Sequence, residues 1–194
     1  MIVALGSNLA GRGGSSRVLL DLAVRRLRRA GLEVYRISPW VSSAPVPRSA
    51  QAMFINGIVC VRTALGPDRL LKVLLEIERE FGRIRLRPNA ARTLDLDLIA
   101  YGDMVCGTAN APALVIPHPR AHRRSFVLQP LRLALPAWRH PVLGETAAEF
   151  LKNLPLGPHL GAAFPVSRPL RGGPGRLKKN VRPKKTQGAA AWPA

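Results

Sequence analysis

Apolar residues recur along this chain with two spacings, near two and near 3.6 residues, which indicates that strands and helices occur in one fold. Runs that are apolar, or that alternate between apolar and polar, predict strands at residues 1–5, 33–41, 53–64 and 92–101. Apolar residues three and four apart predict helices at residues 16–30, 67–81 and 145–153, and in the second half of 117–135. This order of elements predicts a sheet with helices packed on it.

The composition fits a folded domain, because 47% of the 194 residues are hydrophobic and only 21% are charged. No apolar run reaches the roughly 18 residues that a membrane span needs, and the first run is too short for a secretion signal. The two cysteines, Cys60 and Cys106, are too few for a disulfide framework or a cysteine-based zinc site. We therefore expect a cytoplasmic protein with reduced thiols.

Basic residues far outnumber acidic ones, with 30 Lys and Arg against 11 Asp and Glu, which gives a formal net charge of +19. Residues 165–194 contain eight of the basic residues, five prolines and no acidic residue, and they show no apolar periodicity. Such a segment buries too little apolar surface to offset the entropy lost on ordering. We expect a folded domain at residues 1–164 and a disordered basic tail at 165–194 that binds nucleic acid at most weakly.

Leucine and aspartate alternate strictly in the most informative stretch, residues 92–99. In a strand, this alternation places the leucines on one face and Asp95 and Asp97 on the other, about 7 Å apart. Burial of the leucines would hold both carboxylates on the opposite face, where they repel each other unless positive charge lies over them. A pair of Mg²⁺ ions that bind the phosphates of a nucleotide would supply that charge. The alternative is an Asp-x-Asp pair on a solvated strand face.

Four arginines lie close to this aspartate pair in sequence: Arg83, Arg85, Arg87 and Arg92. Guanidinium groups bind phosphate oxygens through two parallel hydrogen bonds, so carboxylates beside arginines favour phosphoryl transfer. The sequence has no Walker GxxxxGK[ST] motif and no GxGxxG motif after a strand, so metals and arginines would have to hold any nucleotide. For the arginines alone, the alternative is an exposed basic loop.

Several short motifs follow one another along residues 2–155: Gly6-Ser7-Asn8, Ile77-Glu78 with Gly82-Arg83, the RTLDLD run at 92–97, and Pro117-His118-Pro119-Arg120. Together they resemble the 6-hydroxymethyl-7,8-dihydropterin pyrophosphokinase (HPPK) family. The resemblance implies ATP-dependent transfer of diphosphate to the hydroxymethyl group of 6-hydroxymethyl-7,8-dihydropterin, with release of AMP, in folate biosynthesis. It also implies an α+β fold, a three-layer α-β-α sandwich around a mainly antiparallel, ferredoxin-like sheet.

The same resemblance implies roles for individual residues. Asp95 and Asp97 would hold two Mg²⁺ ions that bridge the ATP phosphates, and Asp97 would accept the hydroxymethyl proton. With the arginines that match the phosphate-binding positions, the expected catalytic set is Arg83, Arg92 and Asp97. The residues expected around ATP are Glu78, Arg83, Arg92, His118 and Arg124. Those expected around the pterin are Ser43, Ala44, Val46, Phe54, Asn56, Asp95 and Phe126.

Taken singly, several of these residues have a purely structural alternative. Asn56 could satisfy neighbouring backbone groups, and Phe54 and Phe126 could be core residues. His118 could brace a proline-rich turn. The remaining histidines match no family position: His122, His140 and His159.

The sequence departs from the family pattern in two places. Many members have a Trp in a WGPR run before the RTLDLD arginine, where this chain has Asn89-Ala90-Ala91, so its affinity for pterin or ATP is expected to differ. Arg and Thr often precede the Pro-His motif, whereas Ala113 and Val115 stand here, so one phosphate contact and one adenine contact are not expected. Segments 45–50 and 83–91 flank the expected site, and we expect them to close over bound ATP.

Two other functions fit part of the sequence. The charge of +19 fits a nucleic-acid or polyanion-binding protein, although the body lacks the aromatic and basic run of an RNA-binding module. The second is an inactive relative that serves as a partner subunit, and the intact aspartates and arginines argue against it. Other folate-pathway enzymes are the protein partners that the resemblance suggests.

Overall fold

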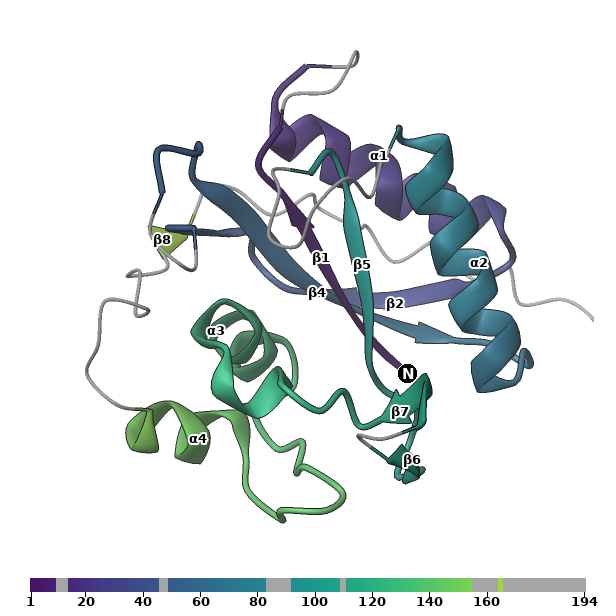
Figure 1. The fold of residues 1–194 in the computed structure, drawn as a ribbon, viewed down its shortest axis with the longest axis vertical. Helices are drawn as coiled ribbons and strands as arrows, with labels where there is room; N and C mark the ends of the chain where they lie inside the picture. The colour runs from purple at the N-terminus through teal and green to yellow at the C-terminus, as the bar shows by residue number, and fades with distance from the viewer. Residues whose placement is uncertain (10–13, 46–48, 83–91, 109–110, 155–163, 166–194) are drawn as a thin grey trace, which may run out of the picture.

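The computed structural model describes residues 1–9, 14–45, 49–82, 92–108, 111–154 and 164–165, and its main sheet carries helices on both faces (Figure 1). The strands of this sheet are β1 (Ile2–Ser7), β2 (Glu33–Ile37), β3 (Val41–Ser43), β4 (Phe54–Arg62), β5 (Asp95–Ala100) and β8 (Phe164–Pro165). They follow the order β5-β1-β4-β3-β8, β2 also pairs with β4, and these pairings are antiparallel. The predicted α+β class is confirmed.

The helices begin and end at residues that favour these positions. The described elements are α1 (Ser16–Arg29), α2 (Pro67–Glu80), η1 (Ala121–Arg123), α3 (Ser125–Ala134) and α4 (Ala147–Asn153). Pro67 occupies the first turn of α2, and Gly82 follows its C-cap with a φ of 77°, which glycine adopts without strain. Thr146 and Glu149 form a capping box at the start of α4. None of the helices in the described ranges is long and apolar enough to cross a membrane.

The main sheet separates two hydrophobic cores. Helices α1 and α2 cover one face, and their core includes Leu74 and Leu96. Helices α3 and α4 cover the other face, where the core includes Phe150. Ile58 and Val59 are neighbours in β4 and enter opposite cores, which explains why this strand reads as a continuous apolar run.

Residues 33–41 form two strands rather than the single strand that the sequence predicts. Residues 38–40 separate β2 from β3. Pro39 has no N–H to donate to a neighbouring strand. Ser38 keeps this stretch bonded to β4. Its backbone N–H donates to the carbonyl oxygen of Ile58, and its Oγ accepts from the N–H of Ile58, each at 2.9 Å.

Three of the described strands, β6 (Cys106–Thr108), β7 (Ala111–Ile116) and β8, were not predicted at all. β6 and β7 form a separate antiparallel pair. Their stretch contains several alanines and a proline, which have low strand propensity, so pairing rather than local preference decides its conformation. At the other end of the main sheet, Pro165 of β8 pairs with Val41, so the sheet includes the first residue of the expected tail.

Candidate active site

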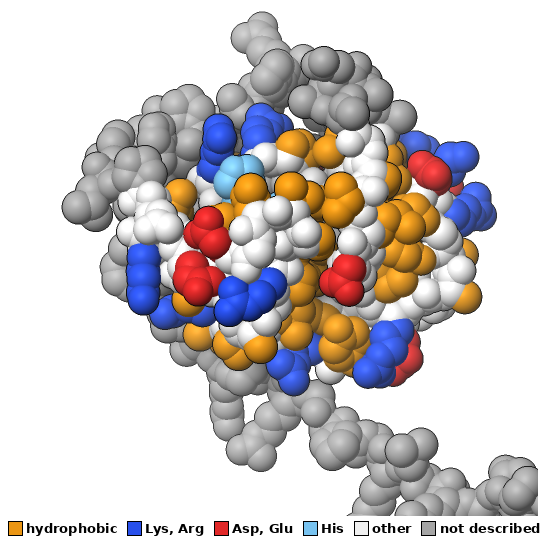
Figure 2. Space-filling view, turned by 90° about the horizontal axis from the view of Figure 1, so that it is seen from below, with side chains coloured by type: hydrophobic (Ala, Val, Ile, Leu, Met, Phe, Trp, Pro, Cys, Tyr) orange, Lys and Arg blue, Asp and Glu red, His pale blue; other side chains and the backbone are white. Residues whose placement is uncertain are grey.

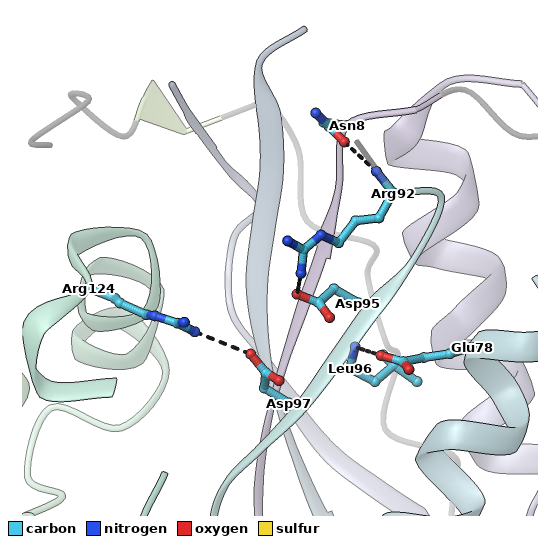
Figure 3. Close-up of polar contacts among 7 residues, drawn as sticks. All are labelled: Asn8, Glu78, Arg92, Asp95, Leu96, Asp97 and Arg124. Atoms are coloured by element: carbon cyan, nitrogen blue, oxygen red, sulfur yellow. Dashed lines mark hydrogen bonds and ion pairs between the residues drawn. The ribbon is translucent and has the colours of Figure 1, made fainter. Parts of the chain in front are cut away.

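Strand β5 presents both predicted aspartates on one face of the main sheet. Asp95 and Asp97 are half-buried, whereas Leu94, Leu96 and Leu98 are buried in the core beneath α1 and α2. The alternation expected from the sequence is therefore present. Burial of the leucines directs the two carboxylates to the face that α3 covers (Figure 3).

Each carboxylate lies beside an arginine (Figure 3). Arg92 Nη1 is 2.6 Å from Asp95 Oδ2, and Arg124 Nη1 is 3.4 Å from Asp97 Oδ2. Arg92 precedes β5 by three residues, whereas Arg124 is the N-cap of α3. The positive charge that limits repulsion between the aspartates thus comes from two distant parts of the sequence, and the same guanidinium groups can bind phosphate oxygens.

His118 lies near this charged group, between β7 and η1. Its backbone N–H donates to the carbonyl oxygen of Ile99 at 2.9 Å, and its Nδ1 accepts from the N–H of Arg120 at 3.1 Å. Burial lowers the pKa of His118, although the negative charge of Asp97 opposes this shift. Burial also lowers the pKa of Arg124, again against the effect of Asp97. The lowered pKa favours the neutral imidazole, which can form uncharged hydrogen bonds beside charged groups.

A second group of predicted residues lies on the strands next to β5. Asn56 of β4 pairs with Gly6 of β1, and Gly6 pairs in turn with Asp95, so one cross-strand row joins the amide to the carboxylate. Asn56 is buried, and its Nδ2 donates to Ser43 Oγ at 2.9 Å, which fixes the orientation of the amide. A Cβ at position 6 would lie 3.0 Å from Asn56 Oδ1. A larger residue at position 6 would therefore crowd the Asn56 amide, and glycine avoids this.

The predicted aromatic residues are half-buried at two places. Phe54 is the first residue of β4, and Ala44 follows β3 directly. Phe126, in the first turn of α3, packs against the core beneath that helix. The guanidinium carbon of Arg124 lies 5.6 Å from the centre of the Phe126 ring. Phe126 and Asp97 therefore share Arg124 as a neighbour.

Glu78 supports β5 from the opposite side. It is a buried residue of α2, and its Oε1 accepts from the backbone N–H of Leu96 at 2.7 Å (Figure 3). Leu96 lies between the two aspartates, so this bond holds the strand at the point from which both carboxylates project. A contact between Glu78 and ATP stays a prediction.

Sequence reasoning assigns no role to Asn8, which the structure places at the site. Its Oδ1 accepts from the backbone N–H of Arg92 at 2.9 Å (Figure 3). The one signal in the sequence was its place in the Gly-Ser-Asn motif directly after a strand. The contact joins residues that are 84 positions apart, which no local pattern reveals.

Some predicted residues cannot be compared with the structure. Arg83, Val46 and His159 lie outside the described residues, as do segment 83–91 and part of segment 45–50. His122 and His140 pack in an aromatic cluster at α4, which fits a structural role.

The donor set on β5 fits magnesium that arrives with a nucleotide. Within the described ranges, no group of three or more His, Cys, Asp or Glu side chains could hold a metal ion. Asp95 and Asp97 supply two carboxylates on one face, and Mg²⁺ typically takes one or two carboxylates, with phosphate oxygens and water completing its shell. The residues therefore fit Mg²⁺ shared with ATP better than a metal held by protein ligands alone.

Comparison with known proteins agrees with this geometry. The family model described as 7,8-dihydro-6-hydroxymethylpterin-pyrophosphokinase (HPPK) matches residues 2–136. The 2-amino-4-hydroxy-6-hydroxymethyldihydropteridine pyrophosphokinase of Synechocystis is 42% identical over 150 residues, 75% of each chain. The Pseudomonas aeruginosa protein of the same name is 38% identical over 160 residues, 79% of this chain and 95% of its own.

Longer proteins also match. The chain is 36% identical over 152 residues to a folic acid synthesis protein of Pneumocystis carinii, and it covers 20% of that protein. In the crystal structure of Plasmodium falciparum HPPK-DHPS with pteroate, the fold is similar, with a TM-score of 0.60 at 14% identity over 78% of this chain and 41% of that one. Family match, sequence identity and site geometry agree, and the chain belongs to the 7,8-dihydro-6-hydroxymethylpterin-pyrophosphokinase family.

Proposed function

We propose that this protein transfers the β,γ-diphosphate of ATP to the hydroxymethyl oxygen of 6-hydroxymethyl-7,8-dihydropterin and releases AMP, as a step of folate biosynthesis. Membership of a pyrophosphokinase family supports this class of reaction. The observation that carries the proposal is the pair of aspartates on one face of β5, with Arg92 beside Asp95 and Arg124 beside Asp97. This arrangement would also distinguish an active enzyme from an inactive relative.

On the nucleotide side, Asp95 and Asp97 would hold two Mg²⁺ ions together with the phosphates. Bound there, the ions would neutralise phosphate charge and stabilise the departing AMP. Arg92 and Arg124, already directed at the two carboxylates, would turn their remaining N–H groups to phosphate oxygens. Arg83 and His118 complete the proposed nucleotide contacts.

The chemical step forms one bond and breaks another. The hydroxymethyl oxygen attacks the β-phosphorus, and the bond from that phosphorus to the bridging oxygen of the α-phosphate breaks, so AMP leaves with the bond's electron pair. Asp97 would take the hydroxymethyl proton. Arg83 and Arg92 would stabilise the charge on the transferred group.

On the pterin side, Asn56 would pair with the donor and acceptor edge of the ring. The bond from Asn56 Nδ2 to Ser43 Oγ supports this role, because it leaves the amide oxygen and one N–H for a ligand in a fixed orientation. The half-buried Phe54 and Phe126 would supply apolar contact for a flat heterocycle. Ala44 and Val46 would form the wall beside them.

The fold supports a finer description than its class. Cores on both faces of the sheet, and the order β5-β1-β4 followed by β3, support a three-layer α-β-α sandwich of ferredoxin-like topology. We propose that the folded domain ends near residue 165 and that the remainder is an accessory tail. Cytoplasmic location and contacts with other folate-pathway enzymes stay predictions.

Polyanion binding is the second candidate function, because the net charge is +19. On the face shown in Figure 2, however, Lys and Arg side chains lie scattered among apolar and acidic ones and do not form one stripe. This face therefore offers no continuous basic stripe to a polyanion (Figure 2), and we propose weak binding through the basic residues after position 165.

AMP release from ATP tests the proposed function. Purified full-length chain is assayed with and without 6-hydroxymethyl-7,8-dihydropterin, and with and without Mg²⁺. We expect AMP only when pterin and metal are both present. A folded sample that forms no AMP in response to pterin would exclude the proposed reaction.

A further inference from the structure

Asn8 connects two separate segments of the site through one side chain. It follows β1 directly and is only 3% exposed. Its Oδ1 accepts from the backbone N–H of Arg92 at 2.9 Å. Its Nδ2 donates to Gln51 Oε1 at 3.1 Å and to the carbonyl oxygen of Ala52 at 3.4 Å. The amide oxygen thus binds the segment that contains Arg92, and the amide nitrogen binds the segment that contains Gln51 and Ala52.

Two of these partners fix the direction of the amide. The backbone N–H of Arg92 can only donate, and the backbone carbonyl of Ala52 can only accept, so a flipped amide would break both bonds. The backbone N–H of Asn8 also donates to the carbonyl oxygen of Arg92 at 3.2 Å, which ties the same residue a second time, through its other peptide group. An aspartate at position 8 could still accept from Arg92 but could not donate to Ala52.

The two segments lead to the two halves of the site. Beyond the peptide that Asn8 binds, the guanidinium of Arg92 reaches Asp95 Oδ2 at 2.6 Å, on the nucleotide side (Figure 3). Ala52 lies just before β4, which carries Asn56 on the pterin side. Asn8 therefore stands where the segments proposed to bind the two substrates meet.

We propose that Asn8 is a positioning residue that sets the separation between bound ATP and bound pterin without contacting either substrate. This inference rests on the function proposed above. In-line attack needs reacting atoms within about 3.5 Å of each other, and a misplacement of about 1 Å can cost about 100-fold in rate. Loss of the amide should therefore lower kcat more than it weakens the binding of either substrate alone.

The test compares two full-length variants with the unmodified chain. Asn8→Asp keeps an acceptor for the Arg92 N–H and removes the donor to Ala52. Asn153→Ala is the matched control, because it removes an exposed asparagine whose contact is a 3.4 Å bond to Glu145 at the end of α4. For each, kcat and both KM values come from pterin-dependent AMP release. Calorimetry gives the dissociation constants of the pterin and of a non-hydrolysable ATP analogue, each alone.

We expect Asn8→Asp to lose about 10- to 100-fold in kcat, while each dissociation constant changes by less than about threefold. Asn153→Ala should match the unmodified chain. A kcat for Asn8→Asp within about twofold of the unmodified value would overturn the inference, as would a loss confined to KM.

A further variant and one comparison separate the positioning role from a folding defect and from failure of the proposed function. Asn8→Ala covers the case in which a new negative charge prevents folding, and a near-normal kcat in this variant also contradicts the positioning role. A merely structural role would lower the melting temperature and leave the kcat of the folded fraction unchanged. Failure of the proposed function itself would show differently, as absence of pterin-dependent AMP from the unmodified chain.

Discussion

Asp95 and Asp97 lie on the same face of one strand, yet they differ in what holds them. Arg92, the partner of Asp95, precedes it by three residues in the same segment, and its Nη1 lies 2.6 Å from Asp95 Oδ2. Arg124, the partner of Asp97, lies at 3.4 Å on an element that packs from the other side of the site. Asp97 therefore depends on the packing of α3 against the sheet, and Asp95 depends mainly on local geometry.

Replacement of Asp97 should separate catalysis from folding. Asp97→Ala removes a proposed metal ligand and proton acceptor, and we expect kcat to fall by about 1,000-fold or more, the effect of several kcal/mol of lost charge stabilisation. The side chain is half-buried and outside the apolar cores, so circular dichroism and melting temperature should stay close to those of the unmodified chain. Asp103→Ala, in the exposed turn after β5, is the control. Near-normal turnover of Asp97→Ala would contradict the two-metal assignment.

Gly6 offers a test of the pterin side. In Gly6→Ala, the new Cβ would lie 3.0 Å from Asn56 Oδ1 and 3.9 Å from the Cβ of Asp95, so the amide must shift. We expect KM for the pterin to rise about tenfold, the cost of roughly one hydrogen bond, with a smaller change in KM for ATP. Gly66→Ala is the control, because a Cβ there meets no atom within 4 Å. Equal changes in both KM values would argue against a pterin site at Asn56.

At the scale of elements, the sequence predicted those features that rest on local periodicity. The leucine and aspartate alternation fixed the face of β5, and the apolar stripe with Pro67 fixed α2. The break at Pro39 was missed because the surrounding residues alternate as in one strand, and only the bonds of Ser38 to Ile58 show where pairing continues.

Site contacts between distant segments could not be predicted in the same way. The bond of Asn8 to Arg92 spans 84 positions, and that of Arg124 to Asp97 spans 27. The family resemblance supplied Arg124 as a candidate, but it gave no partner for the side chain. The packing of α3 on the sheet brings Arg124 to Asp97, and the pairing of β1 with β5 brings Asn8 to Arg92. Residue type and spacing alone do not reveal such pairs.

The start of α4 should contribute measurably to stability. Thr146 Oγ1 accepts from the N–H of Glu149 at 3.3 Å, and Glu149 Oε2 accepts from the N–H of Thr146 at 2.6 Å. We expect Thr146→Ala to cost about 1 kcal/mol of unfolding free energy and to lower the melting temperature by about 2 to 4 °C.

Ser15 provides the comparison for this cap. It caps α1 through one longer bond of 3.5 Å to the N–H of Val18, so Ser15→Ala should cost less. Calorimetric unfolding of both variants measures the difference. An equal or larger loss for Ser15→Ala would contradict the importance assigned to the capping box.

The aromatic cluster at α4 predicts a dependence of stability on pH. Burial lowers the pKa of both His122 and His140, with Arg123 lowering the first further and Glu145 opposing it. An unfolded histidine has a pKa of about 6.5, so as pH falls through that value the unfolded chain takes up protons that the folded chain does not. The stability that these neutral histidines contribute is therefore fully present above about pH 7 and is lost progressively below it.

Thermal unfolding at several pH values between about 7.5 and 5.5 measures this loss, since most carboxyl groups titrate below that window. We expect the melting temperature to fall with pH. In His140→Gln the fall should be smaller, although His140 Nδ1 also accepts from the N–H groups of Val142 and Leu143. A melting temperature that is constant or rises on acidification would contradict the prediction.

At the scale of the whole molecule, we expect the basic residues near the C-terminus to contribute little to the proposed reaction. Eight basic residues and no acidic one lie in residues 166–194, while the proposed site lies on the main sheet. A chain that ends at Pro165 keeps β8 and should retain pterin-dependent AMP release within about twofold.

The same truncation should weaken binding to a polyanion such as heparin, most clearly at low salt, because phosphate or sulfate contacts release counterions. Elution from a heparin column in a salt gradient measures this effect. Equal retention of both chains would place the polyanion affinity on the folded domain, and loss of AMP release would give the segment a part in the reaction.

The bond between Glu78 and Leu96 has a consequence for how copies of the protein behave at high concentration. Among the described strands, β5 is the last on its side of the main sheet, and the backbone groups of such a strand can pair with a strand of another molecule. Glu78 of α2 is buried, and its Oε1 already accepts from the N–H of Leu96, so this backbone group is covered and cannot donate to a further strand. The residue that steadies the aspartate-bearing strand thereby also removes one donor through which a second copy could pair with it.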